Sequence, residues 1–203
     1  MSLEMDTYRK LYLTPRVLER VQRIEVLADH LISNDCLQCF PYVEDLILHG
    51  NLHGLLSAQN AGYRRGIMSR ILNSDLRRLT LHSAFVHFSD FDHPVCNIPE
   101  VTCTSCTFGP DTLSRIPDMY PSLRVLKLFG CGGSFLESQR LLHRLSSVEE
   151  FHVHDWRYQD PRCGRGKLLG SAVSISIDFD SACNLKTLVL DAAFTMLPLF
   201  ASL

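Results

Sequence analysis

The amino-acid sequence predicts an α/β solenoid, in which a curved parallel sheet is built from irregular repeats and helices or coils lie on its convex side. Three observations predict it. A strand-like pattern of apolar residues recurs about seven times. Most copies are spaced as in known repeat proteins. Segments of helical periodicity also separate some of the copies. The whole chain, residues 1–203, is therefore expected to form one domain.

The clearest copy is Leu123–Cys131, which reads LRVLKLFGC. Leu123, Leu126 and Leu128, followed by Cys131, match the LxxLxLxxN/C pattern of leucine-rich repeats. Leu126 and Leu128 are two apart, so a strand points both to one face. Cys131 follows where the chain turns off the strand, and its small side chain can meet backbone groups there. The fold class is thus expected to be a leucine-rich-repeat solenoid.

The same three apolar positions predict strands over residues 21–26, 43–48, 76–81, 98–103, 123–128, 148–153 and 185–190. Their middle apolar residues are Ile24, Leu46, Leu79, Val101, Leu126, Phe151 and Leu188. These lie 22, 33, 22, 25, 25 and 37 positions apart. Four intervals lie in or near the usual range of roughly 20–29 residues, and the two long ones indicate insertions. Similar aromatic-proline segments introduce two of the strands, Phe40-Pro41-Tyr42 and Tyr120-Pro121-Ser122.

Several segments between the strands are expected to be helical. Ser134 and Glu137 form a capping-box pattern that begins a helix ending near Leu145. A short helical or 3₁₀ turn is expected over 111–120, and a helix over 55–72. Residues 1–20 form an irregular lead-in. Residues 159–183 form an insertion before the last repeat, in which 172–179 alternates like an extra strand.

Terminal repeats of a solenoid need polar caps, yet residues 194–203 are mostly apolar. Three explanations stay open: the tail folds over the last repeat, the chain is part of a longer array, or a partner covers the end. The chain has a net charge of −2, which gives no electrostatic case for nucleic acid or an anionic membrane. No signal peptide or membrane-spanning stretch is expected. Eight cysteines in such a chain are expected to be reduced thiols, in the cytoplasm or nucleus.

No catalytic residue, cofactor or metal site is predicted. The sequence lacks a GxSxG nucleophile elbow and a phosphate-binding GxxxxGK[ST] loop. Two CxxC pairs, Cys36–Cys39 and Cys103–Cys106, keep a zinc-binding protein as an alternative, because four thiolates can make a tetrahedral site. However, Cys39 and Cys103 are 64 positions apart, and the repeat pattern already explains Cys103 and Cys106 as an apolar position and a turn position.

The concave face of the sheet is the expected binding surface, and another protein is the expected partner. Charged residues alternate on this face, and we expect Arg124 beside Glu149 and Lys127 beside His152. His152 and His154 share the face, and Phe129 and Trp156 are expected at its edge, since aromatic residues and arginine are favoured binding anchors. The candidate partner-binding residues are Arg78, His82, Arg124, Lys127, Phe129, Glu150, His152, His154 and Trp156.

The irregular spacing and the segments FPYVEDLILHGN, YPSLRVLKLFGC and CNLKTLVLDA resemble the leucine-rich-repeat half of fungal F-box-type proteins. In that family an F-box docks to a ubiquitin-ligase adaptor and the repeats hold a substrate. No F-box-like Leu-Pro helical segment precedes the first repeat here, so the resemblance implies the substrate-recognition half alone. The sequence therefore predicts a non-enzymatic protein-binding scaffold. The alternatives are the zinc-binding protein and a truncated repeat fragment without an independent function.

Overall fold

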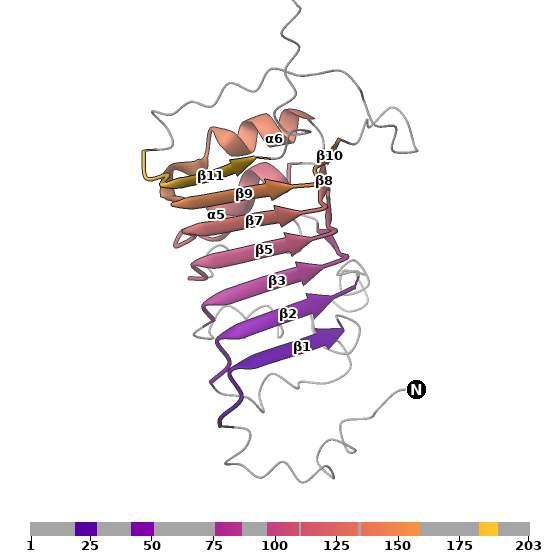
Figure 1. The fold of residues 1–203 in the computed structure, drawn as a ribbon, viewed down its shortest axis with the longest axis vertical. Coiled ribbons are helices and arrows are strands. Elements are labelled where there is room, and N and C mark those ends of the chain that lie inside the picture. Colours follow the sequence, from indigo (N-terminus) through magenta and orange to yellow (C-terminus); the bar gives the residue numbers. More distant parts are fainter. Residues whose placement is uncertain are drawn as a thin grey trace, which may run out of the picture.

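The structure is a computed structural model, and it describes residues 19–27, 42–50, 76–86, 97–109, 111–133, 135–158 and 183–190. Several expected features lie outside these residues: the lead-in as far as residue 18, the helix over 55–72, the strand over 172–179 and the apolar tail over 194–203. The described residues form two parallel sheets and a layer of short helices (Figure 1).

The larger sheet has seven strands, all parallel and ordered as they follow one another in the chain. They are β1 (Arg23–Leu27), β2 (Asp45–His49), β3 (Arg78–His82), β5 (Glu100–Thr104), β7 (Val125–Phe129), β9 (Glu150–His154) and β11 (Thr187–Leu190). All seven strands expected from the sequence are present. Each begins about two residues later than expected, because the first apolar residue of every copy precedes the hydrogen-bonded part.

One register runs through the whole sheet. The middle apolar residues pair directly with one another across the strands, in the order Ile24, Leu46, Leu79, Val101, Leu126, Phe151 and Leu188. Side chains alternate between the two faces of a strand, so a slip of one residue would expose this whole row. The row stays aligned although the connections between its members differ in length.

A second, smaller sheet was not expected from the sequence. Its four strands, each of two residues, are β4 (Phe85–Val86), β6 (Thr107–Phe108), β8 (Gly132–Gly133) and β10 (Arg157–Tyr158). Each follows a strand of the larger sheet after a residue with a left-handed backbone: Ser83, Ser105, Gly130 and Asp155 have φ values of 51°, 54°, 59° and 52°. This residue turns the chain off one sheet and onto the next.

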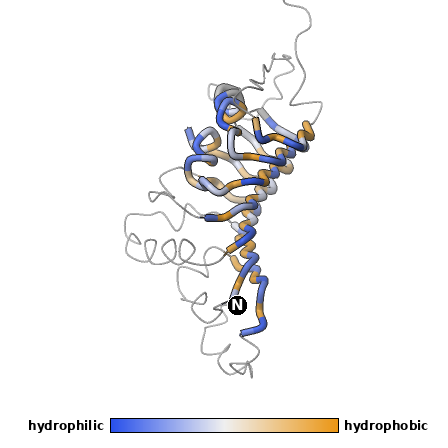
Figure 2. The backbone as a smooth tube through the Cα atoms, turned by 90° about the vertical axis from the view of Figure 1, so that its left-hand side faces the viewer, coloured by the Kyte–Doolittle hydropathy of each residue, from blue (hydrophilic) through white to orange (hydrophobic). Residues whose placement is uncertain are grey.

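The short helices lie on one side of the larger sheet, as the view in Figure 2 shows. They are η5 (Leu113–Arg115), α5 (Ile116–Met119), α6 (Phe135–Leu142) and η6 (Leu145–Ser147). Both helical segments expected in this part of the chain are therefore present. Ser134 of the predicted capping box lies outside the described residues. Its partner Glu137 is buried, and Glu137 Oε2 accepts hydrogen bonds from the backbone N–H and the hydroxyl of Ser114, both at 3.2 Å.

The hydrophobic core lies between the larger sheet and the helices. It is most completely buried around β7 and β9, where Leu126, Leu128, Phe151 and Val153 are fully inaccessible to solvent. Leu141 and Leu142 of α6 close this part of the core from the helix side. Leucines of β11 are only partly buried against the same cluster.

We predict that Phe151→Ala lowers the free energy of unfolding by about 3–5 kcal/mol, because it removes a fully buried ring and leaves a cavity. Thr102→Ala, on β5 and on the opposite, partly exposed face of the sheet, should change it by less than about 0.5 kcal/mol. Urea unfolding of the full chain measures both. Equal effects of the two substitutions would contradict the assignment of the core to the helix side.

Candidate functional site

The candidate binding surface is the open face of the larger sheet, which we define as the strand side chains that alternate with the buried apolar ones. No described helix covers this face. Because the strands share one register, its side chains form three rows that run across the strands. Each row takes one side chain per strand from successive strands, and the three rows differ in charge and in their content of rings.

The first row lies where the chain enters the strands and is mostly charged. Its members are Arg23, Asp45, Arg78, Glu100, Val125, Glu150 and Thr187. Arg78 Nε donates a hydrogen bond to Asp45 Oδ1 at 2.7 Å, which raises the pKa of the Arg78 guanidinium. Lys127 Nζ, from the middle row, donates to Glu100 Oε1 at 3.1 Å. These charges are therefore paired within the sheet.

A further line of ion pairs lies just ahead of the strands. Arg124 Nε is 3.9 Å from Glu149 Oε1, as expected from the sequence. Lys186 Nζ also reaches Glu149 Oε2, at 2.8 Å. The hydrogen bond from Lys186 and the nearby charges of Lys186 and Arg124 lower the pKa of the Glu149 carboxyl. Arg124 thus lies at the border of the open face and is not on a strand.

The middle row contains Glu25, Ile47, Thr80, Thr102, Lys127, His152 and Val189. Lys127 pairs in register with His152, as the sequence predicted. His152 Nε2 lies 3.6 Å from Glu150 Oε2 of the same strand. Threonines occupy the centre of the row, so its charged and titratable groups lie to either side of them.

The last row, where the chain leaves the strands, carries most of the rings. We name it the ring row, and its members are Leu27, His49, His82, Thr104, Phe129 and His154. His49 and His82 stack with ring centroids 4.9 Å apart, and Phe129 and His154 stack at 5.3 Å. Leu27, which is 52% exposed, ends the row.

Seven of the nine residues predicted for binding lie on the open face, and they are Arg78, His82, Lys127, Phe129, Glu150, His152 and His154. Leu27, His49 and Thr104 share the ring row but were not among the predicted residues. Counting three residues on from the middle apolar residue of each repeat would have found all three, because that offset defines the ring row.

The prediction for Trp156 is wrong. Its side chain is 2% exposed and lies against Gly133, where a Cβ atom in place of the glycine hydrogen would come within 3.2 Å of the Trp156 ring. Trp156 follows Phe151 by five residues, the same offset that separates Cys131 from Leu126. Trp156 therefore fills the buried turn position of its repeat and cannot contact a partner at the open face.

Cysteines fill the same turn position in two other repeats. Cys106 Sγ donates to the carbonyl oxygen of Leu81 at 3.3 Å, and Cys131 Sγ donates to that of Cys103 at 3.2 Å. This confirms that the turn-position side chain meets the backbone of the preceding repeat. The hydrogen bond with Cys106 and burial raise the pKa of both the Cys103 and the Cys131 thiols.

A zinc site built from both CxxC pairs would need Cys36 and Cys39, which lie outside the described residues. Only the second pair, Cys103 and Cys106, is described. Within the described ranges, no three His, Cys, Asp or Glu side chains are grouped so that they could hold a metal ion. The described helices also include none that is long and apolar enough to cross a membrane.

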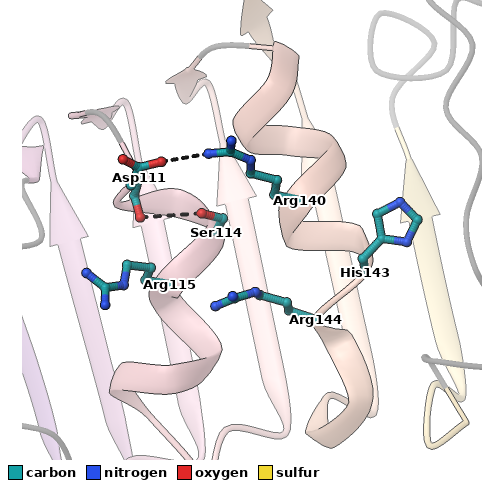
Figure 3. A pocket seen from close by; sticks show the side chains of 6 residues that line it. All are labelled: Asp111, Ser114, Arg115, Arg140, His143 and Arg144. Carbon is teal, nitrogen blue, oxygen red and sulfur yellow. Dashed lines mark hydrogen bonds and ion pairs between the residues drawn. The ribbon is translucent and has the colours of Figure 1, made fainter.

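A pocket of about 510 Å³ opens on the helix side, away from the open face (Figure 3). Its lining residues are Asp111, Ser114, Arg115, Arg140, His143 and Arg144. Arg140 Nη1 donates to Asp111 Oδ1 at 2.7 Å, and Arg144 pairs with Asp118. None of the nine predicted residues lines it. It is formed by two segments more than 20 residues apart, and no motif in the sequence signals it.

No protein-family model matches the chain. No curated protein matches it either.

We predict that the buried thiols react more slowly than an exposed one. Cys103, Cys106 and Cys131 are buried, whereas Cys183 is exposed. A thiol must be accessible to its reagent to react, and burial denies that access to all three of these side chains. Iodoacetamide labelling of the native chain, followed by peptide mass spectrometry, should modify Cys183 first. Equal labelling of Cys131 and Cys183 in the folded chain would contradict this packing.

The Glu149 ion pairs predict a pH-dependent contribution to stability. The carboxyl has a lowered pKa when folded, so the contribution is present above its ordinary pKa of about 4.3 and is lost as the pH falls through the folded value. Lys186→Gln should therefore lower the melting temperature at pH 7, and the difference should shrink below about pH 4. In a Glu149→Gln background, Lys186→Gln should show no such pH dependence. An unchanged difference at low pH would contradict the role of this carboxylate.

Proposed function

We propose that the chain is a leucine-rich-repeat solenoid that binds another protein through the open face of its sheet, without catalysis. Three regularities support the repeat assignment: a single register, a left-handed residue after the strand, and a buried side chain five residues after the middle apolar position. Repeats of this kind cannot bury their own apolar faces and stack into solenoids. The resemblance to F-box-type proteins makes substrate recognition in a ubiquitin ligase of the cytoplasm or nucleus the specific form of this proposal.

The ring row is the observation that carries the binding proposal. It holds two stacked pairs of rings, one from β2 and β3 and the other from β7 and β9, together with the exposed Leu27. Phe129 supplies a large apolar contact area, and the three histidine rings add flat surfaces with hydrogen-bonding nitrogens. Stacking against a neighbour also restricts each ring before binding, which reduces the entropy that a partner must overcome.

The charges of the open face favour a partner that is not strongly charged. The described arginine and lysine side chains of its first two rows are Arg23, Arg78 and Lys127, and the last two pair with carboxylates of neighbouring strands. Exposed pairs of this kind contribute little to stability, and their local neutrality leaves no strong field to attract an opposite charge. The partner is therefore expected to contact the ring row mainly through apolar and hydrogen-bonding groups, with a weak dependence on salt.

A comparative interaction experiment tests the proposal. The full chain and a Phe129→Ala, His154→Ala variant are each used as bait under identical conditions, and every partner is measured for affinity with the purified chain. Loss of a stacked pair at a binding centre should weaken a true partner by roughly 30-fold, equivalent to about 2 kcal/mol. Arg115→Ala, on the helix side, is the matched surface control and should keep the affinity.

The circular-dichroism spectrum and melting temperature of each variant show that the fold is kept. Partners that bind the ring-row variant as tightly as the wild-type chain would contradict the proposal, as would turnover of a substrate by the purified chain. A rise in affinity of more than about tenfold on lowering the salt would contradict the neutral character of the surface.

A further inference from the structure

We propose that the pocket between η5 and α6 binds a phosphate-type anion, that is, a compact group with several negatively charged oxygens. This site lies on the helix side of the sheet and is independent of the function proposed for the open face. Its volume of about 510 Å³ lies within the range of small-molecule sites. Three of its six lining residues are arginines, against one carboxylate, although the whole chain is slightly acidic.

The three arginines lie on two segments of the helix layer. Arg115 ends η5, while Arg140 and Arg144 come from α6 and the turn that follows it. Figure 3 shows the side chain of Arg144 extending from that turn toward the η5–α5 segment, and Arg140 reaching toward Asp111. His143 and Arg115 point away from Arg140 and Arg144 in the same view, so the proposal does not use them as ligands of the anion.

Arg140 and Arg144 already donate hydrogen bonds to carboxylate oxygens. Arg140 Nη1 donates to Asp111, and Arg144 Nη1 donates to Asp118. Each of these bonds uses one terminal nitrogen, whereas a guanidinium carries five N–H donors in a planar fork suited to carboxylate and phosphate oxygens. The acids therefore hold Arg140 and Arg144 in place and leave further donors for a second anion.

These carboxylates also compete with an incoming anion for the arginines. An exposed carboxylate can be displaced by the anion more easily than a buried one. Counting Asp118 and Glu137, which lie beside the lining, three carboxylates accompany the three arginines. Asp111 and Asp118 are more than half exposed, and ion pairs at such positions are weak in water. Either carboxylate can turn to solvent when a dianion, with higher charge and more oxygens, binds its arginine. Glu137 is buried and hydrogen-bonded to Ser114, so it stays in place.

Calorimetric titration of the full chain with inorganic phosphate tests the site. The wild-type chain should bind phosphate saturably, and Arg144→Gln should weaken binding by about tenfold through the loss of a charge-assisted hydrogen bond. Asp118→Asn should act in the opposite direction and strengthen binding by about threefold, because it removes a competing carboxylate. Arg77→Gln removes an exposed arginine ahead of β3 and should leave binding unchanged.

A second titration identifies the source of the anion. A phosphoserine peptide and its unphosphorylated form are compared with inorganic phosphate on the same variants. Tighter binding of the phosphopeptide supports a phosphate carried by a protein, and equal affinities support a free small phosphate.

Two outcomes would overturn the proposal: absence of saturable phosphate binding by the folded wild-type chain, or equal weakening by Arg144→Gln and Arg77→Gln. Weaker binding by Asp118→Asn would contradict the competition between this carboxylate and the anion, because it would mean that the anion needs Asp118 to position Arg144. Melting temperatures of the variants show that each is folded. Loss of open-face binding has no bearing on these results, so the two proposals fail separately.

Discussion

The parallel pairing of seven strands in one register is the constraint on which the rest of this structure depends. A single row of apolar side chains, from Ile24 to Leu188, passes through all the strands. Because side chains alternate on a strand, burial of this row determines which residues face outward. The rows of the open face, the buried turn position and the site of the helices all follow from it.

The same constraint buries the side chain at the turn that follows the strand. After leaving the sheet through a left-handed residue, the chain buries the next side chain against the preceding repeat. Cys106 and Cys131 donate to backbone carbonyl groups there, so each buried thiol has a hydrogen-bond partner. Trp156 fills the equivalent place beside Gly133, where the absence of a side chain leaves room for the indole ring.

Much of the fold could be predicted because local spacing encodes it, whereas the pocket could not. Apolar residues two and three apart identified every strand of the larger sheet, and Lys127 was correctly placed beside His152. Trp156 was misplaced because it was judged by its chemistry and not by its offset from Phe151. Strands of two residues, such as β8, are too short for any periodicity to appear. Arg115 and Arg144 line one pocket only through the packing of separate segments, which no single stretch of sequence encodes.

The uneven connections between the strands have an evolutionary consequence. Neighbouring middle residues are separated by as few as 22 and as many as 37 positions, yet their pairing is uniform. Insertions and deletions in this chain can therefore accumulate in the crossovers while the spacing of the exposed side chains stays the same. Each exposed position can then mutate alone, so the chemistry of the open face can change by point substitution while the spacing of its side chains stays the same.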